Sequence, residues 1–120
     1  MSGRHRARRG VSKAVFDEVS VLWAEHMGLA FPDDLRGVEI HGDPVAYLDF
    51  CMAGPLTSYV GSQRGVLDPD QLRIVKRCAR DLRAHLPRLR RREGRTYVTR
   101  LLRIADLIIS DETRNAYHEE

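Results

Sequence analysis

Residues 68–87 read DPDQLRIVKRCARDLRAHLP, a stretch that carries the signals of an amphipathic helix along its whole length. Asp68 is a favourable N-cap, Pro69 suits the first helical position, and Gln71 stands where a capping box needs it. Pro87 cannot continue a helix, so the helix ends at about residue 86. Apolar residues recur at helical spacing along one side: Leu72, Val75, Ala79, Leu82 and Leu86. We therefore predict a helix over residues 69–86 that buries this side.

Two other stretches show the same helical spacing of apolar residues. The first predicts a helix over residues 13–27, with Ser12 as its N-cap and Gly28 after its end. The second predicts a helix over residues 96–109 with a wide apolar face. Residues 87–95 between the last two helices are expected to form a basic loop.

A fourth helix is predicted to begin at Asp43-Pro44, with Asp43 as N-cap and Pro44 in the first helical position. It should run to about Ala53, where Gly54-Pro55 breaks or kinks it; the alternative is a further turn that continues to Val60. A short extended piece is predicted over residues 37–41, too little for a sheet. The fold class is therefore all-α: a compact, four-helix bundle-like single domain over residues 12–120, preceded by a flexible Arg-rich arm over residues 1–11.

Length and composition limit the classes of protein that fit. The chain has 120 residues, of which 42% are apolar and 31% charged, so one globular domain is expected. No stretch is apolar enough to cross a membrane and no signal peptide is visible, so we expect a cytoplasmic protein without membrane contact. Cys51 and Cys78 have no metal-binding spacing, so we expect free thiols, no metal and no cofactor.

Several short motifs resemble a group of small, uncharacterised all-helical proteins from high-GC bacteria. The resemblance lies in Leu48-Asp49 before Ala53-Gly54, in Leu67-Asp68, in Asp81-Leu82 before Leu86-Pro87, and in the helix from Tyr97 to Leu102. It covers most of the chain from Leu22 onward. It implies a helical fold and an intracellular setting, and it implies no activity.

Charge is distributed unevenly along the chain. Residues 1–13 carry +5, residues 14–71 carry −8, residues 72–103 carry +10 and residues 104–120 carry −4. A basic surface of this kind attracts phosphates or an acidic protein surface. The candidate binding residues of this basic patch are Arg73, Lys76, Arg77, Arg80, Arg83, Arg88, Arg90, Arg91, Arg92 and Arg95. The alternative is a solvated helix face with no ligand.

Asp49 and His26 are the candidate buried polar site. Asp49 is the only charged residue of its apolar helix, and His26 falls within the apolar arc of the first helix. A carboxylate in such a place is costly to bury unless it is paired or neutral. It is either structural, as a buried pair with an Arg or His or at a partly exposed edge, or it is a ligand-binding or catalytic carboxylate. No second carboxylate or nucleophile is tied to it by spacing, which favours the structural reading, and we assign no catalytic residue.

Three functions remain open from the sequence. The first is a non-enzymatic cytoplasmic interaction module, regulatory or immunity-like, that binds an acidic protein partner or associates with itself. The second is binding of nucleic acid without sequence preference through the Arg-rich surface. The third is an enzyme that uses Asp49 in a helical pocket.

Overall fold

The computed structural model describes the backbone of residues 2–40, 42–62 and 65–119, and the side chains of residues 13–40, 42–62 and 65–113. Four α-helices make up most of it: α1 (Ser2–Met27), α2 (Val45–Gly61), α3 (Pro69–His85) and α4 (Arg92–Glu119). Two short 3₁₀ turns, η1 (Asp33–Leu35) and η2 (Leu86–Arg88), and two two-residue strands, β1 (Glu39–Ile40) and β2 (Asp43–Pro44), lie in the connections. The predicted all-α fold is confirmed.

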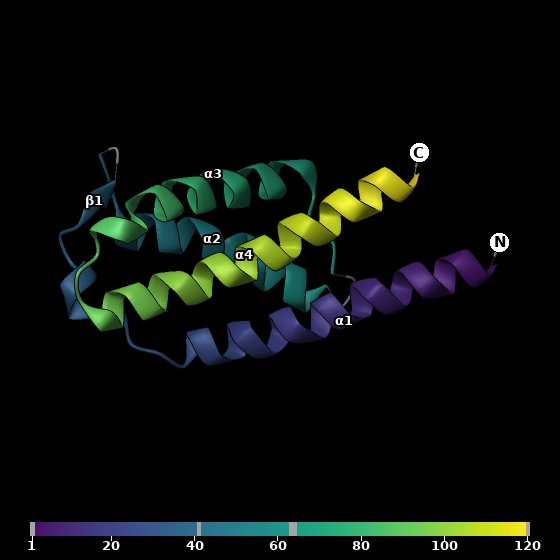
Figure 1. Cartoon of the computed structure of the whole chain (residues 1–120), viewed down its shortest axis with the longest axis horizontal. Helices are drawn as coiled ribbons and strands as arrows, with labels where there is room; N and C mark the ends of the chain where they lie inside the picture. Colours follow the sequence, from purple (N-terminus) through teal and green to yellow (C-terminus); the bar gives the residue numbers. More distant parts are fainter. Residues whose placement is uncertain (1, 41, 63–64, 120) are drawn as a thin grey trace.

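The four helices form an antiparallel bundle in which each helix runs opposite to the next along the chain (Figure 1). Helix α4 lies between α1 and α3, and α2 packs mainly against α3 and less closely against α1. Helices α2 and α4 therefore occupy opposite corners of the bundle. Both chain ends lie at one end of the bundle, and η1, the strands and η2 lie at the other end (Figure 1).

One apolar core fills the space between the helices. Its largest fully buried side chains include Tyr59, Met52 and Leu56 of α2, Leu82 of α3 and Leu101 of α4. Burial of a side chain of this size stabilises a fold by about 1.5–3 kcal/mol. Within the described residues, no helix combines the length and the apolarity that a membrane crossing needs.

Helix α3 follows the sequence prediction closely. The Asp68 side chain accepts a hydrogen bond from the Gln71 backbone N–H at 2.8 Å, and Gln71 Oε1 accepts one from the Asp68 N–H at 3.3 Å. The capping box is therefore confirmed. The predicted inward side is buried at Val75, Ala79 and Leu82.

Two predictions about helix α2 are wrong. Asp43 is not its N-cap: Asp43-Pro44 is β2, which pairs antiparallel with β1, and Pro44 takes the cap position without a side-chain hydrogen bond. The extended piece predicted over residues 37–41 contains β1, and it pairs with Asp43-Pro44, the residues predicted to start the helix. Gly54-Pro55 also does not end the helix, which runs on to Gly61. A proline inside a helix costs about 3 kcal/mol, and burial of Pro55 and Leu56 offsets it.

Helices α1 and α4 are longer than predicted. Ser12 is not an N-cap, because α1 already begins at Ser2; the segment before it contains no proline, and arginine and alanine favour helix. Helix α4 begins at Arg92 rather than residue 96, so Arg92 and Arg95 belong to a helix and not to the predicted basic loop. Whether residues 1–11 form a flexible arm in solution stays a prediction.

Gly94 in the first turn of α4 allows a close contact with η1. A Cβ atom added at Gly94 would overlap the Asp34 carboxylate and would lie 3.0 Å from Leu35 Cδ2. The missing side chain lets Asp34 approach the N-terminus of α4, where the helix dipole favours negative charge. The early start of α4 and the position of η1 therefore depend on each other.

We expect Gly94→Ala to lower the free energy of unfolding by about 1 kcal/mol, although alanine is the better helix former. The reason is the overlap with Asp34 and Leu35. Urea unfolding monitored by circular dichroism measures the change. The double variant Gly94→Ala/Asp34→Ala should recover most of the loss, and a single variant more stable than the wild type would contradict the contact.

Candidate functional site

Asp49 stands at the centre of a polar cluster that joins three helices. Its Oδ1 lies 3.4 Å from His26 Nε2 on α1, and its Oδ2 accepts a hydrogen bond of 3.0 Å from the Tyr97 hydroxyl on α4. His26 is 3% exposed and Tyr97 7%, while the Asp49 side chain keeps 25% of its surface in solvent. The structure thus brings together the two residues of the candidate buried polar site and adds Tyr97.

Aromatic rings enclose the cluster. The His26 ring stacks on Trp23, with 5.6 Å between centroids, and lies 4.3 Å from the Tyr97 ring. Phe31 meets Tyr97 edge to face. Among the described residues, His26 Nδ1 is buried without a hydrogen-bond partner. Burial and the neighbouring Asp49 carboxylate both raise the pKa of Tyr97, so its hydroxyl stays protonated and donates a hydrogen bond to Asp49 throughout the physiological range.

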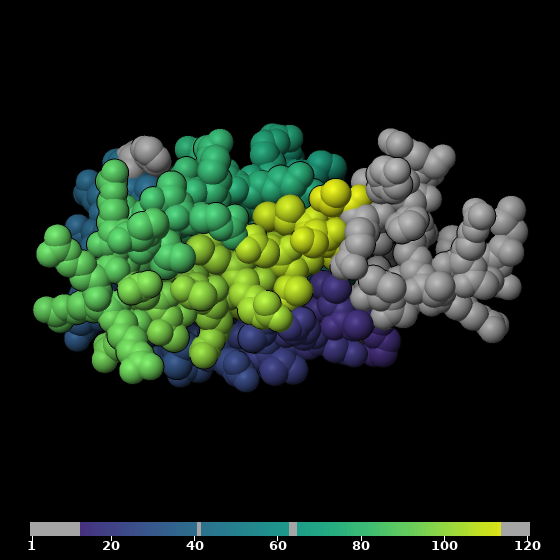
Figure 2. Space-filling model, in the orientation of Figure 1, coloured from purple at the N-terminus to yellow at the C-terminus, as the bar shows by residue number. Residues whose placement is uncertain are grey.

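The surface of α4 carries two adjoining open grooves. The first has a volume of about 670 Å³ and lies along the N-terminal half of α4 and the edge of α1. Its lining residues are Leu22, Arg90, Arg92, Arg95, Thr96, Thr99, Arg100 and Arg103. We call it the arginine groove. Figure 2 looks onto the face where α4 lies between α3 and α1.

The second groove, of about 530 Å³, shares Arg92, Thr96 and Arg100 with the first. We call it the apolar groove, because the connection after α1 supplies Leu29, Ala30, Phe31 and Pro32 and α4 supplies Tyr97. The carboxyl-bearing residues Asp33 and Glu93 also line it, together with Arg36. Tyr97 therefore belongs to both the polar cluster and this groove, whereas neither groove is lined by Asp49 or His26.

The predicted basic patch divides into two parts with different surroundings. On α3, three arginines are paired with nearby carboxylates: Arg73 with Asp70 at 3.1 Å, Arg80 with Asp81 at 3.5 Å, and Arg83 with Asp106 of α4. The Arg73–Asp70 and Arg83–Asp106 pairs are exposed and contribute little to stability, whereas Asp81 is buried. All three carboxylates reduce the local positive charge. Lys76 and Arg77 are exposed between them.

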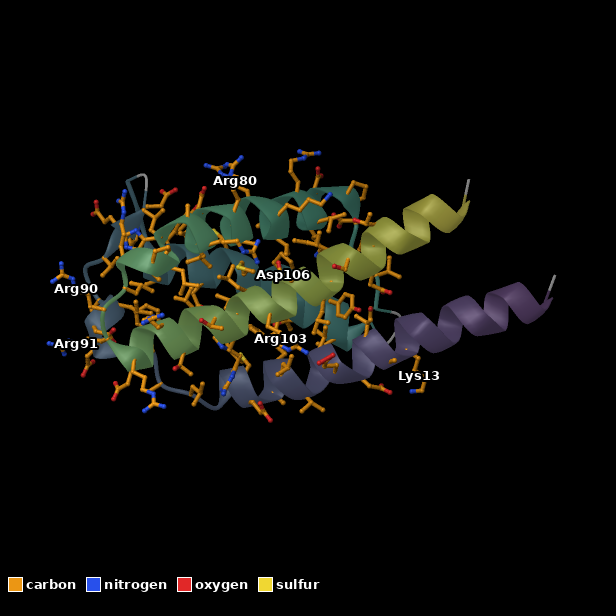
Figure 3. All side chains as sticks on the ribbon, in the orientation of Figure 1. Lys13, Arg80, Arg90, Arg91, Arg103 and Asp106 are labelled. Carbon is orange, nitrogen blue, oxygen red and sulfur yellow. The ribbon has the colours of Figure 1, made fainter. Side chains whose placement is uncertain are left out.

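The second part of the predicted basic patch surrounds the start of α4. Arg88, Arg90, Arg91, Arg92, Arg95 and Arg100 form no salt bridge with any carboxylate of the described residues. Arg90 and Arg91 point away from the bundle at its end (Figure 3). Arg103 is different, because it pairs with Glu18 of α1 at 2.6 Å. Arg100 and Arg103, which add to the basic surface expected from the sequence, both line the arginine groove.

Other candidate groups show no arrangement for chemistry. Both cysteines are free, as predicted, and burial raises the pKa of the Cys78 thiol to about 11, which makes it a poor nucleophile. No group of three or more His, Cys, Asp or Glu side chains in the described part of the chain could hold a metal ion. The sequence also carries a His-x-Asp motif at His41 and Asp43, but His41 lies outside the described residues.

Comparison of the chain with protein-family models, with curated proteins and with solved structures found no match.

We expect Asp49→Ala to lower the free energy of unfolding by about 3 kcal/mol, because it leaves the Tyr97 hydroxyl and His26 Nε2 buried and unpaired. Denaturant unfolding followed by Trp23 fluorescence measures the effect. The matched control is Asp17→Ala, which removes an exposed pair with Lys13 and should cost less than about 0.5 kcal/mol. Equal losses in the two variants would show that the cluster is not a special source of stability.

The raised pKa of Tyr97 predicts a loss of stability at high pH. In the unfolded chain a tyrosine ionises near pH 10, whereas folded Tyr97 keeps its proton, so the free energy of unfolding falls as pH rises above about 10. Burial raises the pKa of Tyr59 as well, so the pH dependence of the wild type alone does not report the effect of Tyr97 separately. The stability advantage of the wild type over Tyr97→Phe should shrink between pH 9 and pH 11 (approximate limits of the tyrosine titration). A constant difference over that range would contradict the shift.

Proposed function

We propose that the protein binds an acidic segment of a partner protein in the arginine groove of α4. The observation that carries the proposal is the set of arginines around the start of α4 without a carboxylate partner among the described residues. Four of them, Arg90, Arg92, Arg95 and Arg100, line one groove. Like charges held side by side repel one another, and an anion in the groove would relieve that repulsion.

Carboxylates suit this groove chemically. The guanidinium group offers a planar fork of donors that matches a carboxylate with two parallel hydrogen bonds. Thr96 and Thr99 add hydroxyl groups on the same side of α4. Leu22 is the one apolar residue of the lining, and the aliphatic stems of the arginines supply further apolar surface beside their guanidinium groups.

The apolar groove favours a protein segment over a nucleic acid. It continues directly from the arginine groove and offers Leu29, Phe31 and Tyr97 to an apolar side chain. Asp33, which pairs with Arg36 at 3.1 Å, and Glu93 also line this groove, so it attracts a chain of phosphates less than the arginine groove does. An acidic segment with one aliphatic or aromatic residue beside its carboxylates would use both grooves.

The paired arginines of α3 also favour a protein segment over a nucleic acid as the ligand. A duplex is bound through many phosphate contacts spread over a long basic surface. On α3 that surface is interrupted by Asp70, Asp81 and the Asp106 carboxylate of α4. Lys76 and Arg77 of α3 have no carboxylate partner among the described residues, but the largest group of unpaired arginines surrounds the start of α4, which fits a short acidic segment. The enzyme hypothesis has no comparable support, because Asp49 lines neither groove.

The experiment titrates the full chain with three fluorescent probes: an acidic peptide that contains leucine and phenylalanine, a peptide of equal charge without apolar residues, and a random-sequence duplex. We expect the first peptide to bind at least tenfold more tightly than the second, which corresponds to about 1.4 kcal/mol from the apolar groove. Arg92→Glu/Arg100→Glu should weaken its binding at least a hundredfold, since it reverses two charges.

Arg73→Glu is the matched control, because Arg73 is an exposed arginine of α3 outside both grooves. It should change peptide affinity less than threefold. Equal sensitivity of binding to Arg73→Glu and to the groove variant would refute the proposed site. Tighter binding of the duplex than of either peptide would instead favour nucleic acid as the ligand.

A further inference from the structure

The solvent-exposed side of α2 is unlike the rest of the surface. Asp49 is the only charged residue of α2, and it faces His26 and Tyr97 rather than open solvent. The exposed side instead carries two large aromatic residues, Phe50 at 75% exposure and Tyr47 at 53%. In a chain with 31% charged residues, an uncharged helix side of this length with exposed aromatic rings is a mark of an interaction surface.

The exposed residues of α2 follow the spacing of a helix–helix seam. Tyr47, Phe50, Gly54, Thr57 and Gly61 succeed one another at intervals of three, four, three and four residues, and all five are exposed. This is the repeat at which two helices pack side by side along their length. Beyond Gly54 and Gly61 the space is open, because a Cβ added at either position would meet no atom within 4 Å.

We propose that this side of α2 binds the α2 helix of a second copy of the chain, antiparallel, about a two-fold axis near Gly54. The large residues stand in the first half of the seam and the small ones in the second half. An antiparallel pair centred on Gly54 sets Tyr47 against Gly61 of the other copy and Phe50 against Ser58, beside Thr57. Every large side chain then meets a small one, and Gly54 lets the two helices approach closely.

The distribution of charge also favours a second copy of the chain as the partner of α2. A two-fold dimer buries the same surface of both copies, so an exposed charge on the seam would be buried twice. The seam contains none, whereas the exposed side of α3 carries Arg73, Lys76 and Arg77 and that of α4 carries Arg95 and Arg100. A strongly charged partner finds no counter-charge on the seam either. Helix α2 is therefore the side of the bundle on which two copies can pack without repulsion.

The pairing leaves the proposed binding grooves accessible. Helices α2 and α4 contact different neighbours and occupy opposite corners of the bundle. A dimer through α2 thus presents one arginine groove on each outer side. The inference rests on the seam alone and holds whether or not the grooves bind an acidic segment.

Sedimentation equilibrium of the full chain at about 100 μM tests the proposal, because a dimer with a micromolar dissociation constant is then almost completely formed. The expected mass is twice the 13.7 kDa of one chain. Phe50→Glu should raise the dimer dissociation constant at least tenfold, whereas the control Val21→Glu, at an exposed apolar position of α1, should leave it unchanged. A wild type of 13.7 kDa at this concentration, or equal effects of the two variants, would overturn the proposal.

A cross-linking variant tests the register separately. In a Cys51→Ser background, Gly54→Cys places a thiol on each side of the two-fold axis, within reach of a disulfide if the helices approach closely at that point. Mild oxidation should convert most of this variant into a covalent dimer, and Val21→Cys in the same background should stay largely uncross-linked. Absence of the cross-link in a protein that sediments as a dimer would contradict the antiparallel pairing about Gly54.

Discussion

The Asp49 carboxylate is the contact on which the arrangement of the other helices depends. It is the one charged group of an otherwise apolar helix, and it is engaged on both oxygens, by His26 of α1 and by Tyr97 of α4. Apolar packing is tolerant of small shifts, whereas two directional contacts to one carboxylate allow few positions. Asp49 thus fixes where α1 and α4 stand relative to α2.

The positions of the two grooves depend on the contacts that Asp49 makes with the other helices. Tyr97 is held by Asp49 on one side and lines the apolar groove on the other, so the buried cluster sets the position of the first turns of α4. The contact between Gly94 and Asp34 fixes the same turns from the end of the bundle. The arginines of α4 are then displayed from a rigid helix, and a groove that is fixed in advance loses less entropy when it binds a ligand.

The sequence predicted those elements whose signals are local. The capping box at Asp68 and the apolar spacing of α3 needed no knowledge of the rest of the chain. The predictions were wrong where contacts with other segments determine the structure. Asp43-Pro44 pairs with β1 instead of starting a helix, and Pro55 is buried within α2 instead of ending it. The start of α4 packs against η1, and α4 begins earlier than predicted. Asp49 and His26 could be singled out by their unusual places, but Tyr97 looked like an ordinary core aromatic. Which arginines are paired depends on neighbours such as Asp106, which sequence spacing does not reveal.

We propose that a partner meets the unpaired arginines of the arginine groove rather than the basic residues of α3, of which Lys76 and Arg77 are exposed without a carboxylate partner among the described residues. An NMR titration that follows the Nε–Hε signals of the arginine side chains tests it most directly, with the acidic peptide that contains leucine and phenylalanine as ligand. We expect the signals of Arg92, Arg95 and Arg100 to shift and to saturate together, while those of Arg73 and Arg80 stay in place. Shifts concentrated on α3, or spread evenly over all arginines, would contradict the claim.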